Sequence, residues 1–275
     1  MSNLLKRSLT GIIFVAILLS GTIIHPVVFT LVFGILLFLT QLELYQLVEK
    51  AGFMPHKIAG LAAGILLFIV CGSIVNGYIP AQYCLIFIPL VIFIFIFEIF
   101  RTKPGALQNA AQTLFGFIYV AIPFSLLHFL VFPGYPSNGS FHPWILTGIF
   151  FIVWVYDSSA YLFGTKFGKH KMCKTISPKK SWEGFIAGTV FALITGILNA
   201  VLFPALSLPN WIAISVWVVA AGTLGDVFES KIKRELNIKD SGTVLPGHGG
   251  FLDRFDSLLF SVPFVFIWLI LAGNI

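Results

Sequence analysis

Charged residues are scarce in this chain of 275 residues, because Asp, Glu, Lys and Arg together make up 10% of it. A soluble protein carries about a quarter. Hydrophobic residues account for 58% of the chain and include 30 Phe, which is more apolar surface than one globular core can bury. The composition therefore excludes an ordinary soluble domain and predicts an all-α, polytopic integral membrane protein whose solvent is lipid.

Cysteine pairs and the common catalytic motifs are also missing. Cys71, Cys84 and Cys173 are scattered and form no CxxC pair, so neither a disulfide framework nor a zinc site is expected. No GxxxxGK[ST] sequence occurs, which excludes a P-loop fold, and neither GxSxG nor HExxH is present. Without an internal repeat or a low-complexity linker, the chain is expected to form a single transmembrane domain over residues 1–275.

Apolar runs long enough to cross about 30 Å of hydrocarbon as helices occur nine times. The first run is short and meets the second at His25-Pro26, so this pair forms either a tight hairpin or a partial crossing. Pro89 and Pro123 lie inside runs and are expected to kink them. The predicted spans are 8–24, 27–48, 58–76, 80–99, 108–132, 144–165, 182–205, 211–230 and 256–273.

Charge is absent from every second loop. If the N-terminus lies inside, the inside segments hold all 17 Lys and Arg, give or take a residue at the span ends, and the alternate segments hold no charged residue. This distribution predicts a cytoplasmic N-terminus and an outside C-terminus. The net charge of +6 is spread over short loops, so anionic lipids or phosphorylated substrates are the expected partners, and nucleic acid is not. The inside segments are 1–7, 49–57, 100–107, 166–181 and 231–255.

Acidic residues concentrate late in the chain, and acids at membrane depth are typical of functional sites. Asp157 lies in the sixth span, Asp226 and Glu229 lie near the end of the eighth, and Asp253 and Asp256 open the ninth. Clustered carboxylates repel one another, and a hard cation such as Mg²⁺ relieves that repulsion through oxygen ligands. The cluster contains no His or Cys, which argues against zinc. Neighbouring lysines could instead neutralise the acids without a metal, and that alternative stays open.

Small and cationic residues accompany the acids in two inside loops. Ser177-Pro178 is typical of an N-cap followed by proline at the first helical position. A helix start is therefore predicted there, aiming backbone N–H groups at an anion beside Lys179 and Lys180. In the second loop, Gly247-His248-Gly249-Gly250 lets the backbone approach a ligand closely. Acids, a divalent cation and lysines around a glycine turn favour phosphoryl chemistry, in which the protein positions groups and neutralises charge.

Four sequence blocks late in the chain resemble the signature of the phosphatidate cytidylyltransferase (CDP-diglyceride synthetase) family. They are 230–234 (SKIKR), 239–242 (KDSG), 245–250 (LPGHGG) and 253–256 (DRFD). Residues 157–161 and 176–184 resemble the family's second conserved block. The signature spans nearly thirty residues with fixed spacing and shows no departure, whereas the first 140 residues match only as hydrophobic spans.

The resemblance implies a bundle of nine helices, a homodimer, and a polar cavity that faces the cytoplasm and opens to the bilayer. Because the sequence shows no organelle-targeting extension, the expected location is the inner membrane of a bacterium. Residues 1–140 would mainly supply scaffold spans, and residues 144–256 would supply the catalytic helices and cytoplasmic loops. The implied reaction is attack of a phosphatidic acid oxygen on the α-phosphorus of CTP, which yields CDP-diacylglycerol and pyrophosphate. The family depends on Mg²⁺, and a second, monovalent cation such as K⁺ can accompany it.

The resemblance also implies roles for individual residues. Asp226 and Asp253 match the family's metal-binding aspartates, and Glu229 and Asp256 would complete or orient the metal shell. Asp157 would be a third ligand or a cavity-lining partner of a lysine. His248 would bond a phosphate or give a proton to pyrophosphate, unless it only shapes the turn. The groups expected to hold substrate are Ser177, Lys179, Lys180, Lys233, Arg234, Gly249, Gly250 and Arg254, with Lys179 also counted as catalytic.

Three other functions compete with this prediction. A polyprenol kinase that uses CTP, or a CDP-archaeol synthase that accepts an isoprenoid ether lipid, would need the same acids and glycines. An ion-coupled transporter would also place acids in the membrane. Against the transporter, the acids cluster on one side of the membrane, and no paired broken helices suggest inverted repeats.

Overall fold

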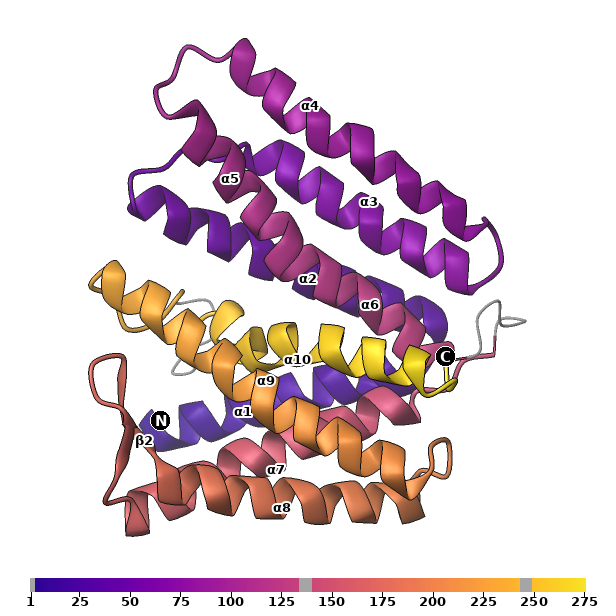
Figure 1. The fold of residues 1–275 in the computed structure, drawn as a ribbon, viewed down its shortest axis with the longest axis vertical. Helices are drawn as coiled ribbons and strands as arrows, with labels where there is room; N and C mark the ends of the chain where they lie inside the picture. The colour runs from indigo at the N-terminus through magenta and orange to yellow at the C-terminus, as the bar shows by residue number, and fades with distance from the viewer. Residues whose placement is uncertain (1–2, 134–139, 243–248) are drawn as a thin grey trace. The chain divides into compact units, whose positions relative to one another are not determined.

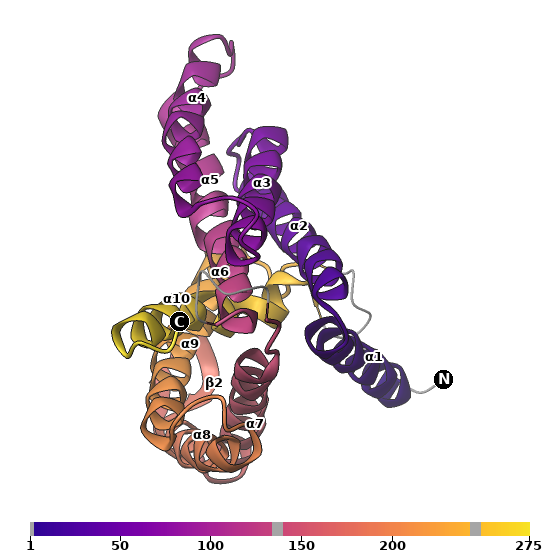
Figure 2. The ribbon, with the colours of Figure 1, turned by 90° about the vertical axis from the view of Figure 1, so that its right-hand side faces the viewer.

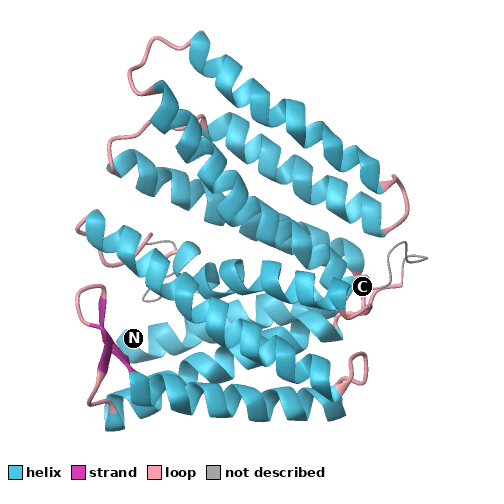
Figure 3. Cartoon of the chain, viewed as in Figure 1, coloured by secondary structure: helices cyan, strands magenta, loops and turns pink. Residues whose placement is uncertain are grey.

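The computed structural model describes residues 3–133, 140–242 and 249–275, and these residues are almost entirely helical (Figure 1). One two-stranded hairpin interrupts the helices (Figure 3). The α-helices are α1 (Asn3–Ile23), α2 (Pro26–Lys50), α3 (Lys57–Val75), α4 (Phe87–Ile99), α5 (Ala106–Gly116), α6 (Ile122–Val131), α7 (Trp144–Phe167), α8 (Trp182–Leu202), α9 (Leu208–Glu235) and α10 (Leu252–Leu271). A 3₁₀ helix η1 (Ala81–Ile86), a π-helix η2 (Phe117–Ala121) and strands β1 (Lys171–Cys173) and β2 (Ser177–Ser181) complete the set.

These helices confirm the predicted all-α, polytopic class. Among the described residues, eight helical stretches are long and apolar enough to cross a membrane, and Leu9–Ile23 forms a shorter apolar helix. Each predicted span coincides with one of these nine stretches. The direction in which the chain crosses the bilayer stays a prediction.

The chain forms two compact units. The first comprises Met1–Phe141 and Asp240–Phe255, and the second comprises His142–Lys239 and Asp256–Ile275. The segment predicted to carry the catalytic groups, 144–256, therefore contributes residues to both units.

In the first unit, α2 packs against α1, α3 and α5, and α3 also contacts α4 and α6 (Figure 2). Phe29, Phe33 and Phe68 are buried in this packing. The distortion predicted at Pro123 takes the form of the π-helix η2, which ends two residues before the proline. A locally wider helix relieves the clash between a proline ring and the carbonyl four residues earlier.

In the second unit, α8 packs against both α7 and α9. Small residues bring α7 and α8 close together, because a Cβ on Gly184 would lie 2.6 Å from the carbonyl oxygen of Ala160. Close backbone approach through small residues is a common way for helices to associate in lipid, where apolar surfaces give little driving force. Between these helices the chain makes the β1–β2 hairpin, whose partners include Lys171 with Ser181.

The helix start predicted at Ser177-Pro178 is wrong. These residues belong to strand β2, and α8 begins at Trp182 with Ser181 as its N-cap. The Ser181 hydroxyl accepts a hydrogen bond from the Gly184 N–H at 3.2 Å. A two-stranded hairpin has only edge strands, and edge strands are where proline is tolerated within a sheet. The sequence also supplies a second N-cap serine four residues later, and that one caps the helix.

Candidate active site

Asp226 on α9 is held by two groups of the second unit. Its Oδ2 lies 2.7 Å from the Lys180 ammonium on β2, and the Ser230 hydroxyl, one turn along α9, donates to its Oδ1 at 3.3 Å. Lys180 and Asp226 are both partly exposed, so the ion pair is reachable from outside the protein. The structure thus brings together an acid and a cation that the sequence predicted separately.

Asp157 and Asp256 lie within electrostatic reach of one another, and Asp226 lies within reach of Asp256. The three carboxylates come from α7, α9 and α10. Helices α9 and α10 can cross this closely because a Cβ on Gly225 would overlap the carbonyl oxygen of Asp256. Mutual repulsion of three acids is unfavourable, and acids retained within membrane spans are typical of a functional site.

Glu229 and Lys233 form an ion pair one turn apart on α9. Their relative exposures are 1% and 9%, so this pair lies deeper than the Lys180–Asp226 pair. Lys233 also acts electrostatically on Asp256. Both residues were predicted to act on metal or phosphate, and the structure shows that each has the other as a partner.

Strand β2 directs the side chains of Lys179 and Lys180 to opposite faces. Successive side chains of a strand point to opposite faces, and accordingly Lys180 meets Asp226 whereas Lys179 is exposed. Ser177 is partly buried at the start of the strand. Arg234 donates from Nε to the Ile176 carbonyl at 3.3 Å and from Nη1 to the Ile238 carbonyl at 3.0 Å. The guanidinium therefore ties the end of α9 to the hairpin.

Asp253 belongs to the first unit, where it lies in the first turn of α10. Its Oδ2 accepts hydrogen bonds from the Ser241 N–H at 2.9 Å, the Ser241 hydroxyl at 2.9 Å and the Gly250 N–H at 2.8 Å. Gly249 has a φ of +78°, and a Cβ there would overlap the same oxygen. The predicted close approach of a glycine backbone to an anion is present, and the anion it meets is Asp253. Arg254 is exposed.

Glu43 is a residue of this site that the sequence analysis missed. It lies on α2, is 4% exposed, and hydrogen-bonds to the Ser241 hydroxyl and to the Phe251 N–H, the latter at 2.8 Å. A single acid inside an otherwise apolar span was a usable signal, since membrane-embedded acids are functional by default. Its partners lie about 200 residues away along the chain, beyond the reach of any periodicity.

His248 lies outside the described residues. Asp226 and Asp253 belong to different units, so their predicted convergence on one cation stays a prediction.

The oxygen-rich donor set fits Mg²⁺ better than zinc. Among the described residues, no three His, Cys, Asp or Glu side chains are grouped so as to hold a metal ion by themselves. Mg²⁺ usually takes one or two carboxylates and completes its shell with water and substrate phosphates. Asp226 and Asp256, which lie close together on crossing helices, match that requirement. Glu229 is already paired with Lys233.

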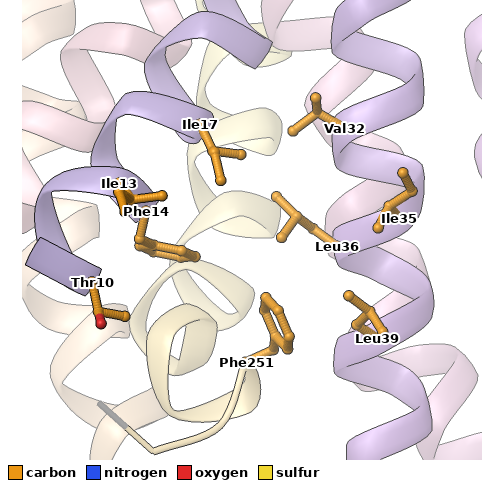
Figure 4. A pocket seen from close by; sticks show the side chains of 9 residues that line it. All are labelled: Thr10, Ile13, Phe14, Ile17, Val32, Ile35, Leu36, Leu39 and Phe251. Carbon is orange, nitrogen blue, oxygen red and sulfur yellow. The ribbon is translucent and has the colours of Figure 1, made fainter. Parts of the chain in front are cut away.

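An apolar pocket of about 300 Å³ lies in the first unit between α1 and α2 (Figure 4). Apart from Thr10, it is lined by aliphatic and aromatic side chains of these helices, with Phe251 at one end. Phe251 follows Gly250, whose N–H binds Asp253. The pocket offers hydrophobic surface and no catalytic group.

The fold and the acidic sites define the class of protein. The model of the cytidylyltransferase family matches residues 5–272, and the chain belongs to this family. Its relatives include phosphatidate cytidylyltransferases of Staphylococcus saprophyticus and of Staphylococcus aureus (strain COL). Each is 33% identical over 271 residues, which cover 96% of this chain and 98% of the relative. The phosphatidate cytidylyltransferase of Staphylococcus haemolyticus is 41% identical over 165 residues, covering 59% of this chain and 60% of the relative.

Proposed function

We propose that this chain transfers the cytidylyl group of CTP to phosphatidate, giving CDP-diacylglycerol and pyrophosphate. The observation that supports this most is the similarity to phosphatidate cytidylyltransferases over 96% of the chain. A phosphate oxygen of phosphatidate forms a bond to the α-phosphorus of CTP, the bond from that phosphorus to the bridging oxygen breaks, and pyrophosphate leaves with the electron pair. Because the attacking oxygen is already anionic, no strong general base is needed.

The cationic side chains would bind and orient the phosphates. Lys180 would exchange part of its contact with Asp226 for a phosphate oxygen, and exposed Lys179 would meet incoming nucleotide. Arg254 would hold the departing pyrophosphate. Holding two anions in line removes translational freedom and screens their repulsion, which are the main contributions a protein makes to phosphoryl transfer. The residues proposed to assist in binding the substrate phosphates are Ser177, Arg234, Gly249, Gly250 and, outside the described residues, His248.

The metal site is proposed to contain Asp226 and Asp253, with Asp256 and Asp157 beside them. Glu229 would complete or orient the metal shell, and its ion-pair partner Lys233 would hold a phosphate. Bound Mg²⁺ would neutralise phosphate charge, and a monovalent cation such as K⁺ would add to that neutralisation. The Asp226 carboxylate would be held in place for the cation by its contacts with Ser230 and Lys180.

The membrane setting is proposed as the cytoplasmic membrane of a bacterium, with the acids near its inner face and the protein as a homodimer. The charge distribution supports this side, because the loops that carry Lys179, Lys180 and Arg254 belong to the positively charged set.

Two radiolabels on CTP test the reaction. Purified protein is supplied with Mg²⁺, with CTP labelled either in cytidine or in the γ-phosphate, and with phosphatidate, a polyprenol or an ether-linked isoprenoid lipid as the acceptor. Cytidine label should enter the lipid, and γ-label should appear in pyrophosphate. Entry of γ-label into a polyprenol would instead identify a lipid kinase. Use of an ether-linked isoprenoid acceptor in preference to phosphatidate would identify a CDP-archaeol synthase.

A further inference from the structure

Glu43 is an acid buried in the middle of a hydrophobic helix. It is 4% exposed and lies on α2, seven residues before the helix ends at Lys50. A carboxylate in such a place is unfavourable unless its oxygens accept hydrogen bonds. Glu43 satisfies this requirement with the Ser241 hydroxyl on Oε1 and with the Phe251 N–H on Oε2, at 2.8 Å.

The two partners of Glu43 belong to, or directly follow, the residues that hold Asp253. The Ser241 N–H and hydroxyl, together with the Gly250 N–H, donate to the Asp253 carboxylate. Phe251 is the next residue after Gly250. Glu43 on α2 therefore binds Ser241, which donates to Asp253 on α10, and Phe251, which follows the other donor, Gly250.

Two glycines leave the space that the Glu43 carboxylate occupies. A Cβ on Gly250 would overlap Glu43 Oε1, and a Cβ on Gly242 would lie 2.9 Å from the Glu43 carboxylate. Any side chain at either position would push the acid away. The glycines of the signature thus leave room for Glu43, a use that their sequence alone does not reveal.

We propose that Glu43 is a positioning residue for cytidylyl transfer: by fixing Ser241 and Phe251 it sets the orientation of the Asp253 carboxylate. This inference rests on the proposed function. The role is one of hydrogen-bond geometry, and the charge of Glu43 is not required for it. A serine hydroxyl has one proton, so Ser241 donates to only one of the two carboxylates at a time. When it donates to Glu43, Asp253 keeps the N–H donors of Ser241 and Gly250.

Glutamine distinguishes geometry from charge. In Glu43→Gln, the amide oxygen can accept from the Phe251 N–H while the amide nitrogen donates to Ser241 Oγ, which then gives its own proton to Asp253. Glu43→Gln should therefore retain kcat within about threefold, because each hydrogen bond has a replacement. Glu43→Ala should lower kcat about 10- to 100-fold, the usual effect of removing a group that orients a metal ligand. The KM for CTP should change much less.

The experiment uses full-length protein in detergent micelles that contain phosphatidate, with kcat and KM measured for wild type, Glu43→Gln, Glu43→Ala and Ser241→Ala. Glu49→Ala is the matched control, since Glu49 lies on the same helix, is exposed and pairs with the partly exposed Lys57. Ser241→Ala removes the hydroxyl that joins the two acids and should reproduce the kcat loss of Glu43→Ala.

Hydrogen–deuterium exchange of the peptides around residues 249–253 supplies a readout that does not need activity. Exchange should accelerate in Glu43→Ala and stay near wild type in Glu43→Gln. Wild-type kcat in folded Glu43→Ala, or in Ser241→Ala should the first variant not fold, would overturn the proposal. So would a Glu43→Gln variant as slow as Glu43→Ala. If wild type makes no CDP-lipid, the proposed function fails, while the exchange pattern still reports on the positioning.

Discussion

At the scale of single residues, Lys180 and Asp226 show how the site can stay charged within a membrane protein. Each is the counter-ion of the other at 2.7 Å, and both remain partly exposed. A pair with this exposure gains little net stability. The pair is better suited to function than to stability. An incoming phosphate or cation can replace one partner of the pair without leaving the other partner buried and unpaired.

Replacing Lys180 tests that view. Lys180→Ala should lower kcat/KM for CTP about 10- to 100-fold, since a hydrogen bond to a charged group is removed. Lys180→Arg should restore part of the loss. Lys231→Ala is the control, because Lys231 belongs to the signature block 230–234 but is exposed and contacts Glu235 at 3.9 Å. Equal activity of Lys180→Ala and wild type would remove Lys180 from the site.

At the scale of elements, the crossing of α9 and α10 places two acids side by side. The crossing is made by Gly222 and Gly225, which face Ser257 and Asp256. Stacked rings of Trp217 and Phe264, 5.3 Å apart, extend the same contact along the helices. A site built from the ends of two packed helices is held more rigidly than one built on loops.

Gly225→Ala should separate α9 from α10. Its new Cβ would overlap the Asp256 carbonyl, and overpacking of this kind typically costs about 1–3 kcal/mol. We expect a lower Tm in detergent and a loss of activity larger than the loss of folded protein. Leu224→Ala, at the neighbouring exposed position, should leave both unchanged. A Gly225→Ala variant with wild-type Tm and activity would contradict the close crossing.

The hairpin before α8 carries a second prediction at this scale. Ser181 caps α8 through the Gly184 N–H, and loss of an N-cap typically costs about 1 kcal/mol. Ser181→Ala should therefore lower Tm modestly. Ser177→Ala should lower Tm less than Ser181→Ala, since Ser177 does not begin a helix. A larger loss of Tm in Ser177→Ala than in Ser181→Ala would instead support the helix start that the sequence predicted at Ser177.

Elements were predictable to the extent that one dominant force sets them. Lipid imposes about twenty apolar residues per span, so the nine runs match the helices. The α9 helix nevertheless continues to Glu235, five residues past its predicted end, and stops where Asn237 adopts a φ of +54°. The capping choice between Ser177 and Ser181 depends on strand pairing, which local sequence does not encode. Glu43 was missed because its partners come from the far end of the chain.

At the scale of the whole molecule, the orientation in the bilayer is the prediction that charge alone makes. Alkaline phosphatase fused after Ile275 should be active, because that terminus is expected outside. The same reporter inserted after Lys103 should be inactive, because that loop is expected to face the cytoplasm. Activity of the second fusion and not the first would invert the orientation and move the site to the other face.

The central claim is that the protein forms CDP-diacylglycerol and pyrophosphate together, and that this reaction requires carboxylates from separate helices. The most direct measurement supplies purified protein with phosphatidate, CTP and Mg²⁺ and quantifies both products. We predict equal amounts of the two from wild type, and neither from Asp226→Asn or Asp253→Asn variants that remain folded and inserted. Pyrophosphate released without CDP-lipid, or full turnover by either variant, would contradict the account.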